Sequence, residues 1–299
     1  MTSATDHNEP DRADDPEAGP IVDVHSHLFR QCCDFDDVFK AESARAHDGE
    51  VDLTVRWDDY AATSPAGTRT IVVGGKARRS GLWVQDQAVA DYVGVHPERL
   101  IGYLSVDPTQ PGWQDELRYG HQELGLRGIK LMPMYAGFDP SDPQYDPLFA
   151  YAEDNGLPIL VHTGTTFVSA APIAYAQPRL LDPVAIRHPE LRMVLAHLGH
   201  PFEGECIAVI RKHPHVYADI SALHYRPFQL WHSLRLAQDY GVLHKLLFGS
   251  DYPFTSVRAS VDGLRAVAAV PGIPGLPPLD RDAVEAIIFR DSLPLLGLS

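Results

Sequence analysis

The sequence predicts an α/β protein, a distorted (β/α)8 TIM barrel with an insertion after its first strand. Eight short apolar runs support this fold class. Their starts are 24 to 34 residues apart, with one longer gap of 49 residues. A βαβ unit takes roughly 30 residues, and strands that are apolar on both faces are typical of a parallel sheet covered on both sides. The eight runs begin near Ile21, Thr70, Leu100, Gly128, Pro158, Arg192, Val216 and Lys245.

Segments with helical periodicity separate these runs. They carry apolar side chains three and four positions apart, which favours helices with one buried face. Strands that alternate with helices close into a barrel when the crossovers are right-handed. The clearest of these segments are residues 83–98, 113–125, 147–156 and 203–213.

The 49-residue gap lies between the first two runs and exceeds what one helix and two loops require. Long loops at the active face of a barrel are commonly lids or substrate walls. We therefore predict a lid-like insertion over residues 28–56, followed by the remains of the first helix over residues 57–64. Residues 1–19 hold six acids, one arginine and no apolar stretch. We expect a disordered acidic tail there, before a single domain over residues 20–299.

Composition argues against several classes of partner and location. The 25 Lys and Arg against 40 Asp and Glu give a formal net charge of −15. Nucleic acid is not an expected partner, because its binding depends on clusters of basic side chains. No window approaches the ~20 apolar residues of a membrane-spanning helix. Of three cysteines, Cys32 and Cys33 are adjacent and adjacent cysteines rarely bridge, so we expect a reducing, cytoplasmic location.

Fifteen histidines direct attention to metal or acid–base chemistry. His25 and His27 are two positions apart at the end of the first predicted strand, so they project from one face, and two such imidazoles can bind one divalent ion. Asp23 would share that face at a deeper level. An isolated pair of this kind is more often two structural histidines at the end of a strand.

Three further polar residues end other predicted strands: His162, His197 and Asp251. The carboxyl ends of barrel strands meet at one face, where barrel active sites lie. Five polar groups buried near one axis are costly unless something satisfies them, and a metal ion with a bound water does so. Asp251 could then accept a proton from that water, and His197 could donate a hydrogen bond to a developing oxyanion.

At this point the sequence resembles a known family. The segments DVHSHLF, GIKLMP, PILVHTG, MVLAHLGHP and LLFGSDYPF, spread from about Ile21 to Phe254, are similar to motifs of the amidohydrolase superfamily. The nearest branch is the amidohydrolase-related group that includes aminocarboxymuconate-semialdehyde decarboxylase-like proteins. The resemblance implies a distorted TIM barrel with one divalent metal ion, usually zinc, with manganese as the alternative.

Carried over by position, the resemblance also implies roles. His25, His27 and His162 resemble the metal ligands, and Asp251 resembles a ligand that also shuttles a proton. His197 resembles the residue that polarises the substrate or holds the metal-bound water. The implied activity is hydrolysis of an amide, ester or lactone, and the alternative is non-oxidative decarboxylation of an aromatic or unsaturated acid. A catalytically silent binding barrel is a third interpretation.

The residues that would bind substrate are less defined. Lys130 at the fourth predicted strand has three interpretations: contact with a substrate carboxylate or with a ligand, a structural role, or a carbamate that bridges two metals. Arg226 and His224 follow the seventh strand, where either a substrate contact or a loop held by charge pairing is expected. A small molecule that carries a carboxylate is the expected substrate. The resemblance makes a homodimer one expected assembly, because members of this family often pair, and the sequence leaves the oligomeric state open.

Overall fold

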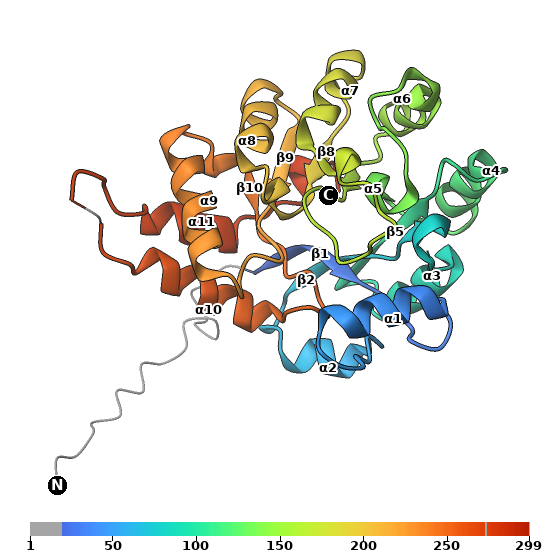
Figure 1. The fold of residues 1–299 in the computed structure, drawn as a ribbon, viewed down its shortest axis with the longest axis horizontal. Coiled ribbons are helices and arrows are strands. Elements are labelled where there is room, and N and C mark those ends of the chain that lie inside the picture. The colour runs from blue at the N-terminus through green and yellow to red at the C-terminus, as the bar shows by residue number, and fades with distance from the viewer. Residues whose placement is uncertain (1–19, 273, 299) are drawn as a thin grey trace, which may run out of the picture.

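Eight parallel strands form the centre of the protein. The computed structural model describes residues 20–272 and 274–298, so the predicted tail at 1–19 lies outside the described residues. The strands follow the order β1-β2-β5-β6-β7-β8-β9-β10, and helices surround them (Figure 1). Backbone bonds from Val24 N to Phe248 O and from His27 N to Tyr252 O join the last strand to the first. The predicted TIM barrel is therefore confirmed. The barrel strands are β1 (Val22–His27), β2 (Arg69–Val73), β5 (Leu100–Val106), β6 (Ile129–Leu131), β7 (Ile159–Val161), β8 (Met193–Leu195), β9 (Val216–Asp219) and β10 (Leu246–Leu247).

Each barrel strand begins within one residue of a predicted start. Nearly every strand residue is buried, as expected when helices cover the outside of a barrel and side chains fill the inside. One apolar cluster connects Val22, Ile71, Leu160 and Leu247 to the C-terminal segment around Leu296. This cluster packs the barrel interior below the polar strand ends.

Helices form at each of the predicted helical segments. The predicted segments at 83–98 and 203–213 contain α3 and α8, and residues 57–64 contain the short α2. The segment at 113–125 begins as α4 and continues as a π-helical turn. The helices are α1 (Asp37–Ala46), α2 (Trp57–Ala62), α3 (Asp86–Val95), α4 (Trp113–Arg118), α5 (Pro133–Ala136), α6 (Asp146–Asp154), α7 (Asp182–Arg187), α8 (Glu203–Lys212), α9 (Pro227–Asp239), α10 (Val257–Ala268) and α11 (Arg281–Phe289). None of the helices in the described ranges is long and apolar enough to cross a bilayer.

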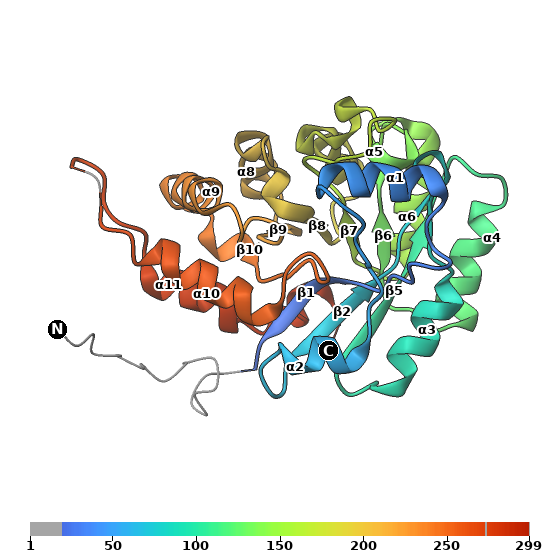
Figure 2. The same ribbon diagram turned by 60° about the horizontal axis from the view of Figure 1, so that its bottom comes forward.

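The segment at 28–56 carries α1 and lies at the end of the barrel to which the strands run (Figure 2). The Asp36 side chain accepts a hydrogen bond from Phe39 N and so caps the start of α1. Trp83 N donates to Asp34 O, which ties the segment to an antiparallel pair, β3 (Lys76–Ala77) and β4 (Leu82–Trp83), that the sequence did not reveal.

A β-bulge in β1 changes the predicted side-chain directions. The register with β2 shifts between Asp23 and Ser26, so β1 has one residue more than β2 over this stretch. Asp23 therefore does not share the face of His25 and His27, and that prediction is wrong. Its carboxylate instead accepts hydrogen bonds from Tyr60 of α2 (3.0 Å) and from the Ser250 hydroxyl (2.6 Å).

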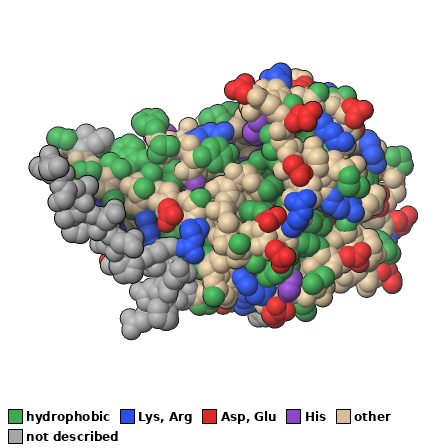
Figure 3. Space-filling view, turned by 90° about the horizontal axis from the view of Figure 1, so that it is seen from below, with side chains coloured by type: hydrophobic (Ala, Val, Ile, Leu, Met, Phe, Trp, Pro, Cys, Tyr) green, Lys and Arg blue, Asp and Glu red, His purple; other side chains and the backbone are tan. Residues whose placement is uncertain are grey.

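The cysteines also differ from expectation. Cys32 and Cys33 are joined by a disulfide, in a turn where Cys33 N and Asp34 N both donate to Arg30 O. Cys206 is buried and free. On the face seen in Figure 3, acidic and basic side chains are interspersed on the right half, and hydrophobic side chains gather at the upper left.

Candidate metal centre

His25 and His27 point their Nε2 atoms at the same spot. His25 Nδ1 lies 3.0 Å from Asp219 Oδ2, and His27 Nδ1 lies 3.2 Å from the Gly74 carbonyl oxygen. Because both partners are acceptors, each ring carries its proton on Nδ1 and leaves a lone pair on Nε2. The two Nε2 atoms are 3.3 Å apart. Two lone pairs at that distance do not satisfy each other, whereas a cation between them does.

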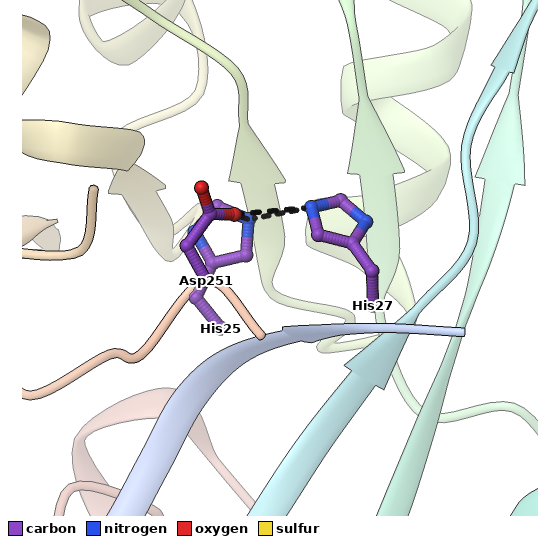
Figure 4. A group of neighbouring side chains, drawn as sticks. All are labelled: His25, His27 and Asp251. Carbon is purple, nitrogen blue, oxygen red and sulfur yellow. Dashed lines mark hydrogen bonds and ion pairs between the residues drawn. The ribbon is translucent and has the colours of Figure 1, made fainter. Parts of the chain in front are cut away.

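Asp251 supplies the third donor atom (Figure 4). It follows β10, and its backbone N–H donates to His25 O at 2.7 Å, which fixes the turn against β1. Its Oδ1 lies 3.5 Å from His25 Nε2 and 3.3 Å from His27 Nε2. Burial is the main cause that raises the pKa of the Asp251 carboxyl, and the nearby Lys130 ammonium opposes this.

The spacing of these three atoms fits one small divalent ion. Zinc bonds of roughly 2.0–2.1 Å at tetrahedral angles put neighbouring ligand atoms about 3.3–3.4 Å apart. The three separations found here are 3.3, 3.3 and 3.5 Å. Burial also lowers the pKa values of His25 and His27 well below normal, so both imidazoles are neutral and able to ligate. Two imidazoles and a carboxylate suit zinc or manganese alike.

Lys130 lies inside this donor group. Its Nζ is 2.9 Å from His25 Nε2, on the lone pair that a metal ion would use. An ammonium and a metal ion compete for that lone pair, so metal binding requires Lys130 to turn away or lose its proton. Burial lowers the Lys130 pKa, which favours the loss.

His197 and His162 stand next to the group. The His197 ring stacks on His25 with centroids 5.1 Å apart, and the His162 ring meets His197 edge-on at 5.2 Å. His162 Nε2 donates to the Thr165 carbonyl oxygen at 3.2 Å. Among the described residues, the donor groups with atoms within 4.8 Å of one another are His25–His27–Asp251 and His25–His197–Asp219. His162, predicted as a ligand, belongs to neither.

A cavity of about 530 Å³ opens over these residues, a volume in the range of small-molecule sites. Apolar side chains form much of its wall. The 28–56 segment contributes Phe29, Phe39 and His47, and the loop after β7 contributes Phe167. The Arg45 guanidinium donates to the Phe167 carbonyl oxygen at 2.8 Å and so links α1 to that loop.

Arg226 is also in the cavity wall. Its Nη1 donates to the Ala222 carbonyl oxygen at 2.8 Å, and its guanidinium lies 4.5 Å from the Tyr225 ring centroid. These contacts hold a positive charge in the cavity wall. Arg226 is close enough to oppose the rise in the pKa of Asp251.

Strained backbone surrounds the site. Five non-glycine residues among those described have positive φ, and three of them line the cavity: His197 (60°), Ala222 (57°) and Asp251 (60°). Such conformations cost roughly 1–3 kcal/mol each and cluster at functional sites. They turn the chain sharply at the ends of β8, β9 and β10, which brings those side chains to one point.

The sequence profile of the family described as amidohydrolase matches residues 22–288. The chain belongs to the amidohydrolase family. A comparison of this amidohydrolase with curated protein sequences finds no match.

Solved structures share the fold of this amidohydrolase. An uncharacterised TIM-barrel protein of Bordetella bronchiseptica is 20% identical with a TM-score of 0.71, covering 93% of this chain and 99% of that one. The 5-carboxyvanillate decarboxylase of Sphingomonas paucimobilis is 13% identical with a TM-score of 0.61, covering 94% and 99%. A probable 2-pyrone-4,6-dicarboxylic acid hydrolase of Acinetobacter baumannii is 17% identical with a TM-score of 0.59, covering 93% and 99%. Similar barrels therefore include both a decarboxylase and a probable hydrolase.

Sequence reasoning missed Asp219 in this amidohydrolase. It is fully buried at the end of β9 and bonds to His25 Nδ1. The signal was available, because Asp219 ends a predicted strand just as His162, His197 and Asp251 do. The sequence alone does not show that it lies behind the imidazole instead of beside the metal position.

His224, predicted to contact substrate, has a different environment. Its Nε2 donates to the Gly249 carbonyl oxygen at 3.1 Å, its ring packs near Phe248, and it is buried at 8% exposure. Its Nδ1 has no hydrogen-bond partner. It is not among the residues that line the described cavity. Burial lowers its pKa to about 4.

The lowered pKa of His224 predicts that the free energy of unfolding falls in acid. A histidine whose folded pKa is depressed contributes stability that is complete above its unfolded pKa of about 6.5 and is lost as pH falls toward about 4. For His224 the loss is on the order of 3 kcal/mol. His224→Gln should therefore lose less unfolding free energy than the parent between pH 7 and pH 4.5, measured by denaturant titration. Exposed His232→Gln serves as control, and equal losses for His224→Gln and the parent would contradict the assignment.

Proposed function

We propose that the protein is a metal-dependent hydrolase of a small, carboxylated organic molecule with an amide, ester or lactone bond. The observation that carries the proposal is the convergence of His25 Nε2, His27 Nε2 and Asp251 Oδ1, 3.3 to 3.5 Å apart, beneath a cavity. These residues would hold the ion. When bound, a divalent ion supplies a Lewis acid and a water of lowered pKa.

The residues of the chain then have distinct tasks. Asp251 accepts the proton of the attacking water and returns it to the leaving group. Burial raises the pKa of Asp251, and a divalent ion, when bound, would oppose that rise. His197 on the cavity wall orients the water. The apolar walls exclude bulk water and accommodate the body of the substrate.

Arg226 and Lys130 give the site its preference for negative charge. Arg226 lies in the cavity wall, and its planar guanidinium suits a carboxylate. Lys130 is buried beside the donor atoms. If it turns away from His25 Nε2 when the ion binds and keeps its proton, its positive charge stays close to any anion that forms during the reaction. A neutral substrate would leave this charge poorly compensated.

A second candidate function is decarboxylation of an aromatic acid. Asp251 lies in the cavity wall, where it would deliver a proton to a ring carbon as carbon dioxide leaves. The ring-lined wall around Phe29, Phe39 and Phe167 would accommodate an aromatic body.

One assay tests the two functions together. The protein loaded with zinc or manganese is incubated with carboxylated lactones, esters and amides and with aromatic acids, and both acid release and carbon dioxide are followed. Acid release without carbon dioxide supports hydrolysis. Carbon dioxide from the aromatic acids favours the second candidate. A protein that binds these compounds and turns over none is a binding barrel.

We expect substitution of Arg226 to weaken substrate binding, seen as a higher KM, and to leave kcat almost unchanged. A charge-assisted hydrogen bond contributes about 1.5–3 kcal/mol, so Arg226→Met should raise KM for a carboxylated substrate roughly 10- to 100-fold with little change in kcat. The methyl ester of that carboxylate should show no such rise. Arg118→Met, at an exposed arginine on α4, is the matched control. An unchanged KM would remove Arg226 from the substrate site.

A further inference from the structure

Asp219 accepts hydrogen bonds from both sides at the end of β9. On one side, Oδ2 lies 3.0 Å from His25 Nδ1. On the other, Oδ1 accepts from His197 N and Ser221 N, both at 3.0 Å, and from the Ser221 hydroxyl at 2.5 Å. Asp219 and Ser221 are fully buried, so no solvent competes for these bonds. One carboxylate thus contacts the His25 ring directly and the His197 ring through the Ser221 hydroxyl.

The proton positions in this network follow from counting donors. Two oxygens 2.5 Å apart need a proton between them, and a carboxylate supplies none, so the Ser221 hydroxyl gives its only proton to Asp219. Ser221 Oγ is then an acceptor toward its other neighbours. These are His197 Nδ1 at 2.8 Å and His25 Nδ1 at 3.2 Å. Both rings therefore carry their proton on Nδ1.

We infer that Asp219, acting directly on His25 and through Ser221 on His197, is a positioning residue that fixes the tautomer of both imidazoles. Both then offer an unprotonated Nε2. For His25 this is the lone pair that faces the metal position. For His197 it means that the neutral ring accepts a hydrogen bond from water, whereas the sequence had suggested donation to an oxyanion.

The alternative role for this group is a second metal site, because His25, His197 and Asp219 also bring donor atoms within 4.8 Å of one another. The hydrogen bonds argue against it. Three donors already occupy Asp219 Oδ1, and the Nδ1 atoms of both rings are in hydrogen bonds with acceptors. An ion at this position would have to replace the hydrogens that the two rings and Ser221 donate to their acceptors. Asp219 therefore orients a ligand and does not serve as one.

Asp219→Asn tests the inference, because an amide has one oxygen and one NH2 group. If the NH2 group faces His25, Nδ1 must lose its proton, which moves to Nε2 and blocks the lone pair. If it faces the other side, three donors lose their acceptor. Loss of such an outer partner typically weakens metal affinity 10- to 100-fold, and we expect that loss for zinc and manganese in competition titrations with a chelator.

Ser221→Ala separates the two rings. His25 keeps its bond to Asp219, so metal affinity should stay within about threefold, while His197 loses its acceptor. Nitrogen-15 spectra of histidine-labelled, metal-free protein report the tautomers directly. The parent should show His25 and His197 protonated on Nδ1. Asp219→Asn should change His25 if its NH2 group faces that ring, or His197 if it faces Ser221, and Ser221→Ala should change only His197. Asp182→Asn, which breaks a surface carboxylate–His213 bond, is the control with unchanged affinity and tautomers at the site.

The inference rests on the proposed function in one measurement only, the metal affinity from the competition titrations. If the parent binds metal and Asp219→Asn binds it equally tightly with unchanged tautomers, the inference is wrong and the proposed function stands. If the parent binds no metal, the proposed function fails, and the tautomers of the metal-free parent and of Ser221→Ala still decide the inference. Parent spectra that show either ring protonated on Nε2 would overturn the inference. The parent spectra therefore decide the inference even if Asp219→Asn does not fold.

Discussion

Asp251→Asn should lower kcat by about 10² to 10⁴-fold, the range for loss of a positioned general acid or base, while the protein stays folded. Asparagine keeps the shape of the side chain and tolerates the positive φ of 60° at this position. The backbone bond from residue 251 to His25 O is retained. The substitution removes the carboxylate that takes and returns the proton, and with it the negative charge of the third donor atom, so kcat is measured at saturating metal. Steady-state kinetics give kcat, and circular dichroism with a thermal melt verifies the fold.

The matched control is Asp115→Asn, which removes an exposed carboxylate on α4 that pairs with Arg118. Its kcat should equal that of the parent. An Asp251→Asn variant that keeps more than a tenth of the parent kcat would show that Asp251 is not the proton-transfer group.

His27→Ala should reduce affinity for zinc and manganese by more than 100-fold. It removes one of three atoms that lie 3.3 to 3.5 Å apart, and a lost ligand costs more than the 10- to 100-fold typical of a lost outer partner. The purified variant should carry far less metal than the parent after dialysis, and turnover should reappear only with excess metal. Elemental analysis and chelator competition measure both.

His47→Ala is a close control for metal affinity, because His47 lines the same cavity but bonds to the Ser43 carbonyl oxygen on the 28–56 segment. Its metal content should match the parent. Equal metal content in parent and His27→Ala would place the ion elsewhere and remove the basis of the candidate centre.

The fold follows closely from the sequence, because apolar runs buried on both faces leave a continuous signal. The short β3–β4 pair gives no such signal, since two-residue strands have no periodicity to detect. The bulge in β1 is hidden for a different reason. It inserts one residue into an otherwise regular strand, so counting by two places Asp23 on the wrong face.

The site is predicted in outline by its position at strand ends. His25, His27, His197 and Asp251 converge as expected, although their roles remain proposals. The contact of Lys130 with His25 Nε2 and the turn of His162 toward Thr165 depend on side-chain rotations. Sequence spacing specifies which strand a residue ends, but not which of two ring nitrogens faces inward.

The positive φ values at His197, Ala222 and Asp251 have a consequence for evolution and engineering. These residues hold conformations that glycine adopts at little cost, so the rest of the barrel must over-stabilise them. A substitution that relaxes one of these turns would raise the melting temperature and at the same time abolish catalytic activity. Selection for heat resistance alone would therefore erode activity, and libraries for stabilisation should leave these three positions fixed.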